Sequence, residues 1–138
     1  MDLKPLFDKA FLMDEAINAN EALDRARTRF RRAEGEKSFS YEVVVPEEPD
    51  AEWLEGTLLR KLVYHCESTR SALPECQGIF VSLFVGDRLY CVPAKDVVAF
   101  GCEALDVDVE TLVARYGTGE LKEAIRPATV LLPGAKEP

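Results

Sequence analysis

Residues 78–92, Gly-Ile-Phe-Val-Ser-Leu-Phe-Val-Gly-Asp-Arg-Leu-Tyr-Cys-Val, decide the fold of this chain. Their first half is rich in β-branched and aromatic side chains, and Gly86 is the first residue of a two-residue turn with Asp87. Because glycine readily adopts the positive φ that a type II′ turn needs, the stretch predicts a β-hairpin.

The first strand of this hairpin is apolar on both faces. Phe80 and Phe84 alternate with a second apolar set that points the other way, namely Ile79, Val81, Leu83 and Val85. Two phenylalanines exposed on a sheet would favour aggregation, so we expect another part of the chain, or a partner, to cover them.

The elements around the hairpin alternate between strand and helix. Patterning predicts a strand over 38–45, a helix that Asp50 caps and Pro74 ends, two helices separated at 106–108, and a last strand over 128–132. The order β-α-β-β-α-β predicts an α+β fold, the ferredoxin-like plait, with a four-stranded antiparallel sheet. In that topology residues 38–45 and 88–92 are central, and residues 78–85 lie at an edge.

Residues 1–37 are expected to form amphipathic helices that precede an α+β domain of residues 38–138. A first apolar stripe covers residues 3–17, and a second repeats every three or four residues from Leu12 through Leu23 to Phe30. Such spacing is typical of a helix that packs along a seam. Leu12, Leu23 and Phe30 therefore predict either a lid over the second face of the sheet or a homodimer contact.

The chain is acidic, with 25 Asp and Glu against 17 Lys and Arg and a formal net charge of −8. The excess lies entirely in residues 38–138. An acidic body is repelled by phosphates and anionic membranes, so nucleic acid and membrane are disfavoured, and a protein with a basic surface is the favoured partner. No apolar run is long enough to cross a bilayer and the start does not resemble a signal peptide, so we expect a cytoplasmic protein.

No pattern of residues indicates catalysis, a metal or a cofactor. The four cysteines, Cys66, Cys76, Cys91 and Cys102, include no closely spaced pair of the kind that structural zinc sites use. His65 adjoins Cys66, but adjacent helical residues point about 100° apart and cannot act as base and nucleophile. Phosphate-binding loops and nucleophile elbows are missing from the sequence. We therefore expect reduced, structural thiols in a protein that is not an enzyme.

A protein-binding module, of the inhibitor, immunity, adaptor or assembly-chaperone kind, suits these features best. Aromatic anchors dominate the energetics of interfaces, so Trp53, Phe80 and Phe84 are the candidate anchors. Glu47, Glu48 and Glu52 would form an acidic rim around them.

Two alternatives remain open. The first is nucleic-acid binding through the one basic cluster, in which Arg25, Arg29 and Arg32 share a helix face. Salt bridges to Glu21 and Asp24 would be the structural use of the same arginines. The second is a small-ligand pocket between the sheet and the N-terminal helices.

Overall fold

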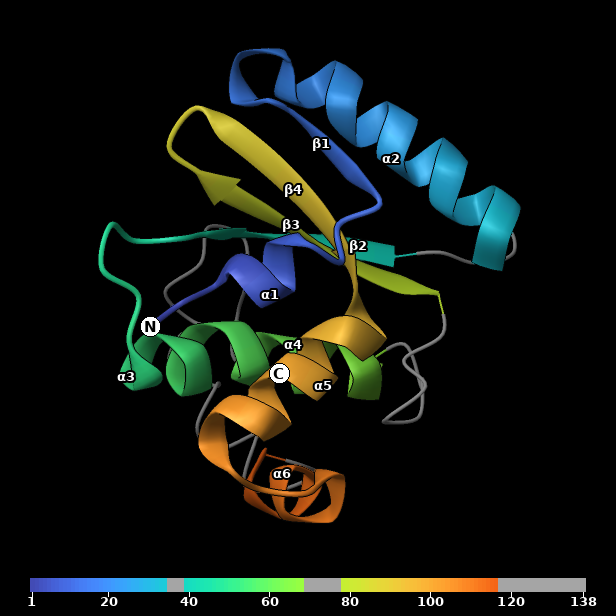
Figure 1. Ribbon diagram of the computed structural model, residues 1–138. Helices are drawn as coiled ribbons and strands as arrows, with labels where there is room; N and C mark the ends of the chain where they lie inside the picture. The colour runs from blue at the N-terminus through green and yellow to red at the C-terminus, as the bar shows by residue number, and fades with distance from the viewer. Residues whose placement is uncertain (35–38, 69–77, 117–138) are drawn as a thin grey trace, which may run out of the picture.

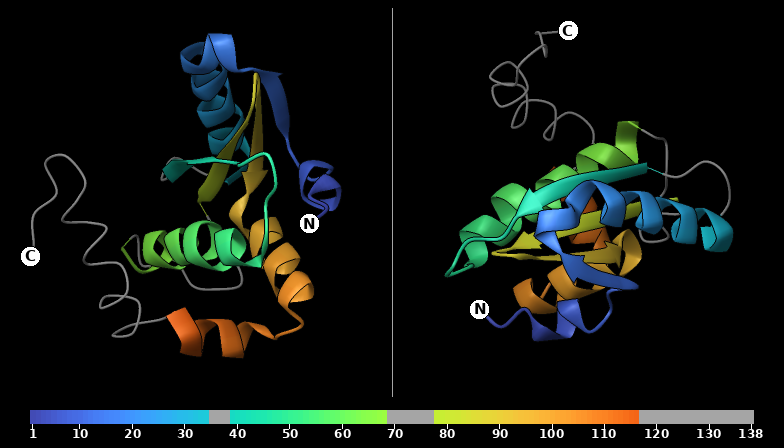
Figure 2. Two further views of the ribbon diagram at one scale, coloured as in Figure 1. Left: turned by 90° about the vertical axis from the view of Figure 1, so that its left-hand side faces the viewer. Right: turned by 90° about the horizontal axis from the view of Figure 1, so that it is seen from above.

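The computed structural model describes residues 1–34, 39–68 and 78–116, which form an α+β fold around one four-stranded mixed sheet (Figure 1). The strand order is β1-β4-β3-β2. Helix α2 lies on one face of the sheet, and α4 and α5 lie on the other (Figures 1 and 2). We call these the α2 face and the core face.

The predicted hairpin is confirmed. Strands β3 (Ile79–Val85) and β4 (Arg88–Pro93) pair antiparallel, with Val85 opposite Arg88. The two turn residues are Gly86 and Asp87, and only Gly86 has a positive φ, of 58°. That combination is the one a type II′ turn requires.

The predicted antiparallel sheet with residues 78–85 at its edge is wrong. Strand β2 (Phe39–Val44) pairs parallel with β3, so β3 is central, and β2 lies at the edge among the strands that the structure describes. Burial explains this order, because β3 is apolar on both faces and a central strand is covered on both. Strand β2 alternates buried and exposed side chains, which an edge position tolerates. The predicted strand over 128–132 lies outside the described residues.

The expected pair of N-terminal helices is also wrong in its first half. Helix α1 is short (Lys4–Phe7), and residues 12–15 form strand β1 (Leu12–Glu15), antiparallel to β4. Four residues are too few to separate a helical from a strand period, and the outer edge of β4 decided between them. Backbone hydrogen bonds from Phe11 to Cys91 and from Ala16 to Asp87, of 2.9 and 2.8 Å, close the two ends of this pairing.

A turn of 3₁₀ helix, η1 (Ala16–Asn18), leads into α2 (Ala19–Glu34), which covers β3 and β4 on the second face of the sheet. Leu23 and Phe30 on α2 are buried against Phe80 of β3, together with Ala22, Ala26, Leu89 and Cys91. One chain therefore covers both faces of its own central strand.

Local interactions set where the helices on the core face begin and end. The side chain of Asp50 accepts a hydrogen bond from the backbone N–H of Trp53 (2.9 Å), which caps a continuous run of α3 (Ala51–Trp53), the π-helical η2 (Leu54–Leu59) and α4 (Arg60–Ser68). Helix α5 (Ala94–Leu105) ends at Asp106, which is left-handed, and α6 (Val109–Tyr116) follows. The two helices predicted around residues 106–108 are confirmed.

Candidate functional site

The aromatic anchors expected at a partner interface are wholly or partly buried in the molecule. Phe80 is fully buried, and Phe84 is half-buried at the margin of the same cluster. The ring centroids of Phe80 and Phe30 are 4.9 Å apart, and those of Phe80 and Phe11 are 5.3 Å apart. Because α2 covers this face, Phe80 is inaccessible to a partner as long as the helix stays in place.

Trp53 is half-buried and packs against the main core. Its indole Nε1 is buried and has no hydrogen-bond partner in the described part of the chain. Only part of this side chain is therefore accessible to a partner.

The three predicted rim carboxylates are exposed, but the structure separates them. Glu47 lines a surface groove, whereas its neighbour Glu48 and the helical Glu52 do not belong to the lining. The structure thus distinguishes Glu47 from Glu48 by their positions relative to the groove, which the sequence could not do.

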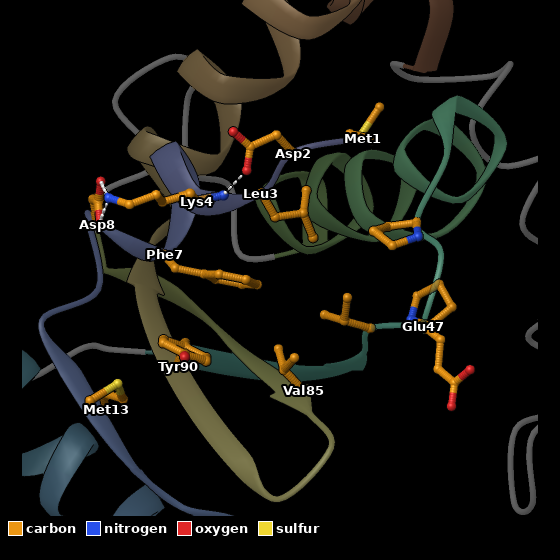
Figure 3. Close-up of a pocket in the computed structure, with 13 residues that line it drawn as sticks. Met1, Asp2, Leu3, Lys4, Phe7, Asp8, Met13, Glu47, Val85 and Tyr90 are labelled. Carbon is orange, nitrogen blue, oxygen red and sulfur yellow. Dashed lines mark hydrogen bonds and ion pairs between the residues drawn. The ribbon is translucent and has the colours of Figure 1, made fainter.

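We call this groove the N-terminal groove. It has a volume of about 530 Å³ and lies between α1, the end of β3, the neighbouring strands β4 and β1, and the loop after β2 (Figure 3). Its lining comprises Met1, Asp2, Leu3, Lys4, Phe7, Asp8, Met13, Val45, Pro46, Glu47, Pro49, Val85 and Tyr90.

The floor of the groove is apolar and aromatic. Phe7 of α1 stacks on Tyr90 of β4 with ring centroids 4.4 Å apart, and Val85 lies beside them (Figure 3). Met13 of β1 projects at one side with 58% of its surface exposed. The sequence singled out none of these residues as a site, because only the packing of α1 against β4 brings them together.

The margin of the groove is acidic. Asp2, Asp8 and Glu47 contribute three side-chain carboxylates against one cationic side chain, that of Lys4. Lys4 Nζ lies 3.0 Å from an Asp8 oxygen, and the hydrogen bond to Asp8 raises the pKa of this lysine. Lys4 is paired with Asp8, and Oδ1 of Asp2 accepts a hydrogen bond from the backbone N–H of Lys4 at 2.9 Å (Figure 3). The side chains of the margin therefore carry a net negative charge, which comes from Asp2 and Glu47.

The predicted arginine face exists on α2, where Arg25, Arg29 and Arg32 line a hollow of about 420 Å³. Two of these arginines are engaged within the chain. Arg25 pairs with Asp14 and reaches Glu21 at 4.0 Å, while Arg29 donates to the backbone carbonyl of Phe11. The contacts with Asp14 and Phe11 hold α2 against β1 and the segment before it.

The thiols that the structure describes are shielded rather than activated. Burial raises the pKa of Cys91 to about 11 and also raises that of Cys102. Burial lowers the pKa of His65, whose ring stacks on Tyr41 with centroids 4.4 Å apart. Among the side chains that the structure describes, no three His, Cys, Asp or Glu residues are grouped so that they could hold a metal ion. The side chain of Cys66 and the whole of Cys76 lie outside the described part.

Comparisons of the chain with protein-family models, with curated proteins and with solved structures find no match. Among the described residues, none of the helices is long and apolar enough to span a membrane.

Proposed function

We propose that this protein is a non-enzymatic protein-binding module whose N-terminal groove receives an apolar side chain flanked by basic residues of a partner protein. One observation carries the proposal. The groove combines an aromatic floor, formed by Phe7 and Tyr90, with an acidic margin at Asp2 and Glu47.

Each part of the groove has a separate physical role. Burying an aliphatic or aromatic side chain on the floor contributes roughly 1.5–3 kcal/mol, which is the kind of anchor that dominates an interface. The carboxylates, together with the net charge of −8, raise the association rate of a basic partner and disfavour acidic ones. An inhibitor, immunity protein, adaptor or assembly chaperone would use a surface of this kind.

A small-ligand site is the second candidate, because the volume of about 530 Å³ falls within the usual range for such pockets. Such pockets typically enclose most of their ligand. Met1 and Met13, which line this groove, are exposed, so a ligand there would keep much of its surface in water. An anchor that belongs to a larger partner suits an open groove better.

The test uses matched variants of the full chain as bait in extracts of the organism that encodes it, followed by affinity measurements with the purified partner. Met13→Lys places a cation in the groove, whereas Ile17→Lys makes the same change at a residue that is 84% exposed outside it. Glu47→Lys and Glu48→Lys form a second pair with equal net charge. We expect Met13→Lys and Glu47→Lys to weaken binding about ten-fold or more and the two controls to change it much less.

Equal effects within each pair would show that overall charge, and not the groove, governs binding. Tight binding of generic DNA or RNA at ~150 mM salt would instead favour the arginine face.

A further inference from the structure

The outer edge of β2 forms a second surface, which no described strand occupies. In the sheet order β1-β4-β3-β2, strand β2 pairs with β3 on one side only (Figure 1). Helix α2 does not cover it either, because the cluster beneath α2 contains residues of β3 and β4 but none of β2.

The pairing with β3 shows which backbone groups face outward. Phe39 donates its N–H to the carbonyl of Gly78, and Val45 donates to that of Phe84, at 2.6 and 2.8 Å. In a β-strand, the N–H and C=O of alternate residues point to opposite sides. Odd-numbered residues of β2 therefore bond to β3, and the N–H and C=O groups of Ser40, Glu42 and Val44 point away from the sheet.

The side chains of the same three residues lie on the α2 face of the sheet, because those of Tyr41, Val43 and Val45 enter the core on the other face. The cluster that α2 covers does not extend over them. Val44 is 74% exposed, Glu42 is exposed and Ser40 is half-exposed. Phe39, at the start of the strand, is 47% exposed. An exposed edge that carries apolar side chains is a template for another strand. Residues 39–44 contain no lysine or proline, and Glu42 is their one charged side chain.

We infer that the β2 edge binds an extended segment of another protein by β-strand addition, with Lys or Arg opposite Glu42 and apolar side chains at the positions beside Ser40 and Val44. Backbone hydrogen bonds would come from the three outward residues, and alternate side chains would supply specificity. The charge of Glu42 selects the basic residue, since opposite charges across strands are favourable and like charges are not. This inference does not depend on the N-terminal groove.

Two other occupants fit the charge less well. A second copy would bring together two chains of net charge −8, with another Glu42 on the added strand. Residues 128–132 of the chain itself, Ala-Thr-Val-Leu-Leu, are apolar but contain no basic residue to face Glu42.

The test uses the full chain and the synthetic peptide Thr-Val-Thr-Lys-Thr-Val-Thr, with a control peptide in which Glu replaces Lys. Amide hydrogen exchange followed by NMR should show slower exchange at Ser40, Glu42 and Val44 when the first peptide binds. The amides of Tyr41 and Val43, which already face β3, should not change. The Lys peptide should bind about five-fold more tightly than the Glu peptide, and Glu42→Lys should reverse that preference while Glu48→Lys leaves it in place.

A proline at position 44 separates edge pairing from folding. The N–H of Val44 points outward, so Val44→Pro removes a group that β3 does not use, and proline is tolerated on such an edge. We expect Val44→Pro to weaken the Lys peptide about ten-fold or more and Val44→Thr, which keeps the N–H, to change it little. Protection of the β3 amides reports that each variant is folded.

Three outcomes would overturn the inference. The first is equal peptide binding by folded Val44→Pro and Val44→Thr. The second is a wild-type dimer that Val44→Pro dissociates in sedimentation, which would assign the edge to a second copy. The third is peptide binding that appears only after Val130→Pro, which would assign the edge to the chain's own residues 128–132.

Discussion

Two glycines on the core-face helices should respond to alanine in opposite directions. Gly101 of α5 is buried, and a Cβ added there would lie 2.6 and 2.8 Å from the Cδ atoms of Leu59. Leu59 is itself fully buried, so its side chain has no open space to move into. Gly56 of η2 is exposed, and a Cβ there would meet no atom within 4 Å.

The expected magnitudes follow from these contacts. Overpacking a core costs roughly 1–3 kcal/mol, and alanine recovers about 1 kcal/mol over glycine in a helix. Gly101→Ala should therefore lower the free energy of unfolding by about 1 kcal/mol. Gly56→Ala has no clash and should raise the free energy of unfolding by about 0.5–1 kcal/mol.

Urea denaturation can measure both changes, with the single tryptophan, Trp53, as the fluorescent probe. A double-mutant cycle with Leu59→Ala isolates the contact. Removing the leucine side chain should make Gly101→Ala neutral or stabilising, although Leu59→Ala alone costs about 2–5 kcal/mol. If Gly101→Ala is equally destabilising with and without Leu59, the steric reasoning is wrong.

Three further predictions concern other parts of the molecule. Phe30→Ala should lower the free energy of unfolding by about 3–5 kcal/mol, because its ring is buried between α2 and β3, and an unchanged melting temperature would refute that packing. Burial lowers the pKa of His65 in the folded protein, so the unfolded state takes up the proton at a higher pH than the folded state does. The free energy of unfolding should therefore fall as the pH drops through about 6.5. Urea titrations at several pH values should show a smaller fall for His65→Phe. Cys91, with a pKa of about 11, should resist a thiol reagent at pH 8 in the folded protein and react after unfolding, which mass spectrometry of labelled peptides can follow.

The elements that the sequence determined are those whose signals are local. The turn at Gly86 depends on the conformational freedom of one residue, and the start of α3 depends on a hydrogen bond between Asp50 and a backbone N–H three residues later. The break between α5 and α6 likewise depends on a few neighbouring residues, since Asp106 adopts a left-handed conformation and Asp108 accepts a bond from the N–H of Thr111 at 2.8 Å. Periodicity and capping act within one or two turns of chain, so they can be recognised without knowing what lies nearby in space.

Only the tertiary structure determines features for which distant segments of the chain compete, such as strand pairing and strand order. Residues 12–15 form a strand because they pair with the edge of β4. Strand β2 lies outside β3 because β3 has two apolar faces that a central position buries. The sequence predicted that Phe80 needed cover, yet it could not say whether α2 or a partner would supply it.

The candidate binding surfaces also depend on contacts between distant segments. Phe7 and Tyr90 are 83 positions apart in the chain and stack only because α1 folds back over β4. Glu47 and Glu48 are equivalent in composition and charge, and only the path of the chain after β2 directs one of them to the groove. A pattern along the chain records which side chains are apolar or charged, but their convergence depends on long-range pairing energies that no short stretch of sequence contains.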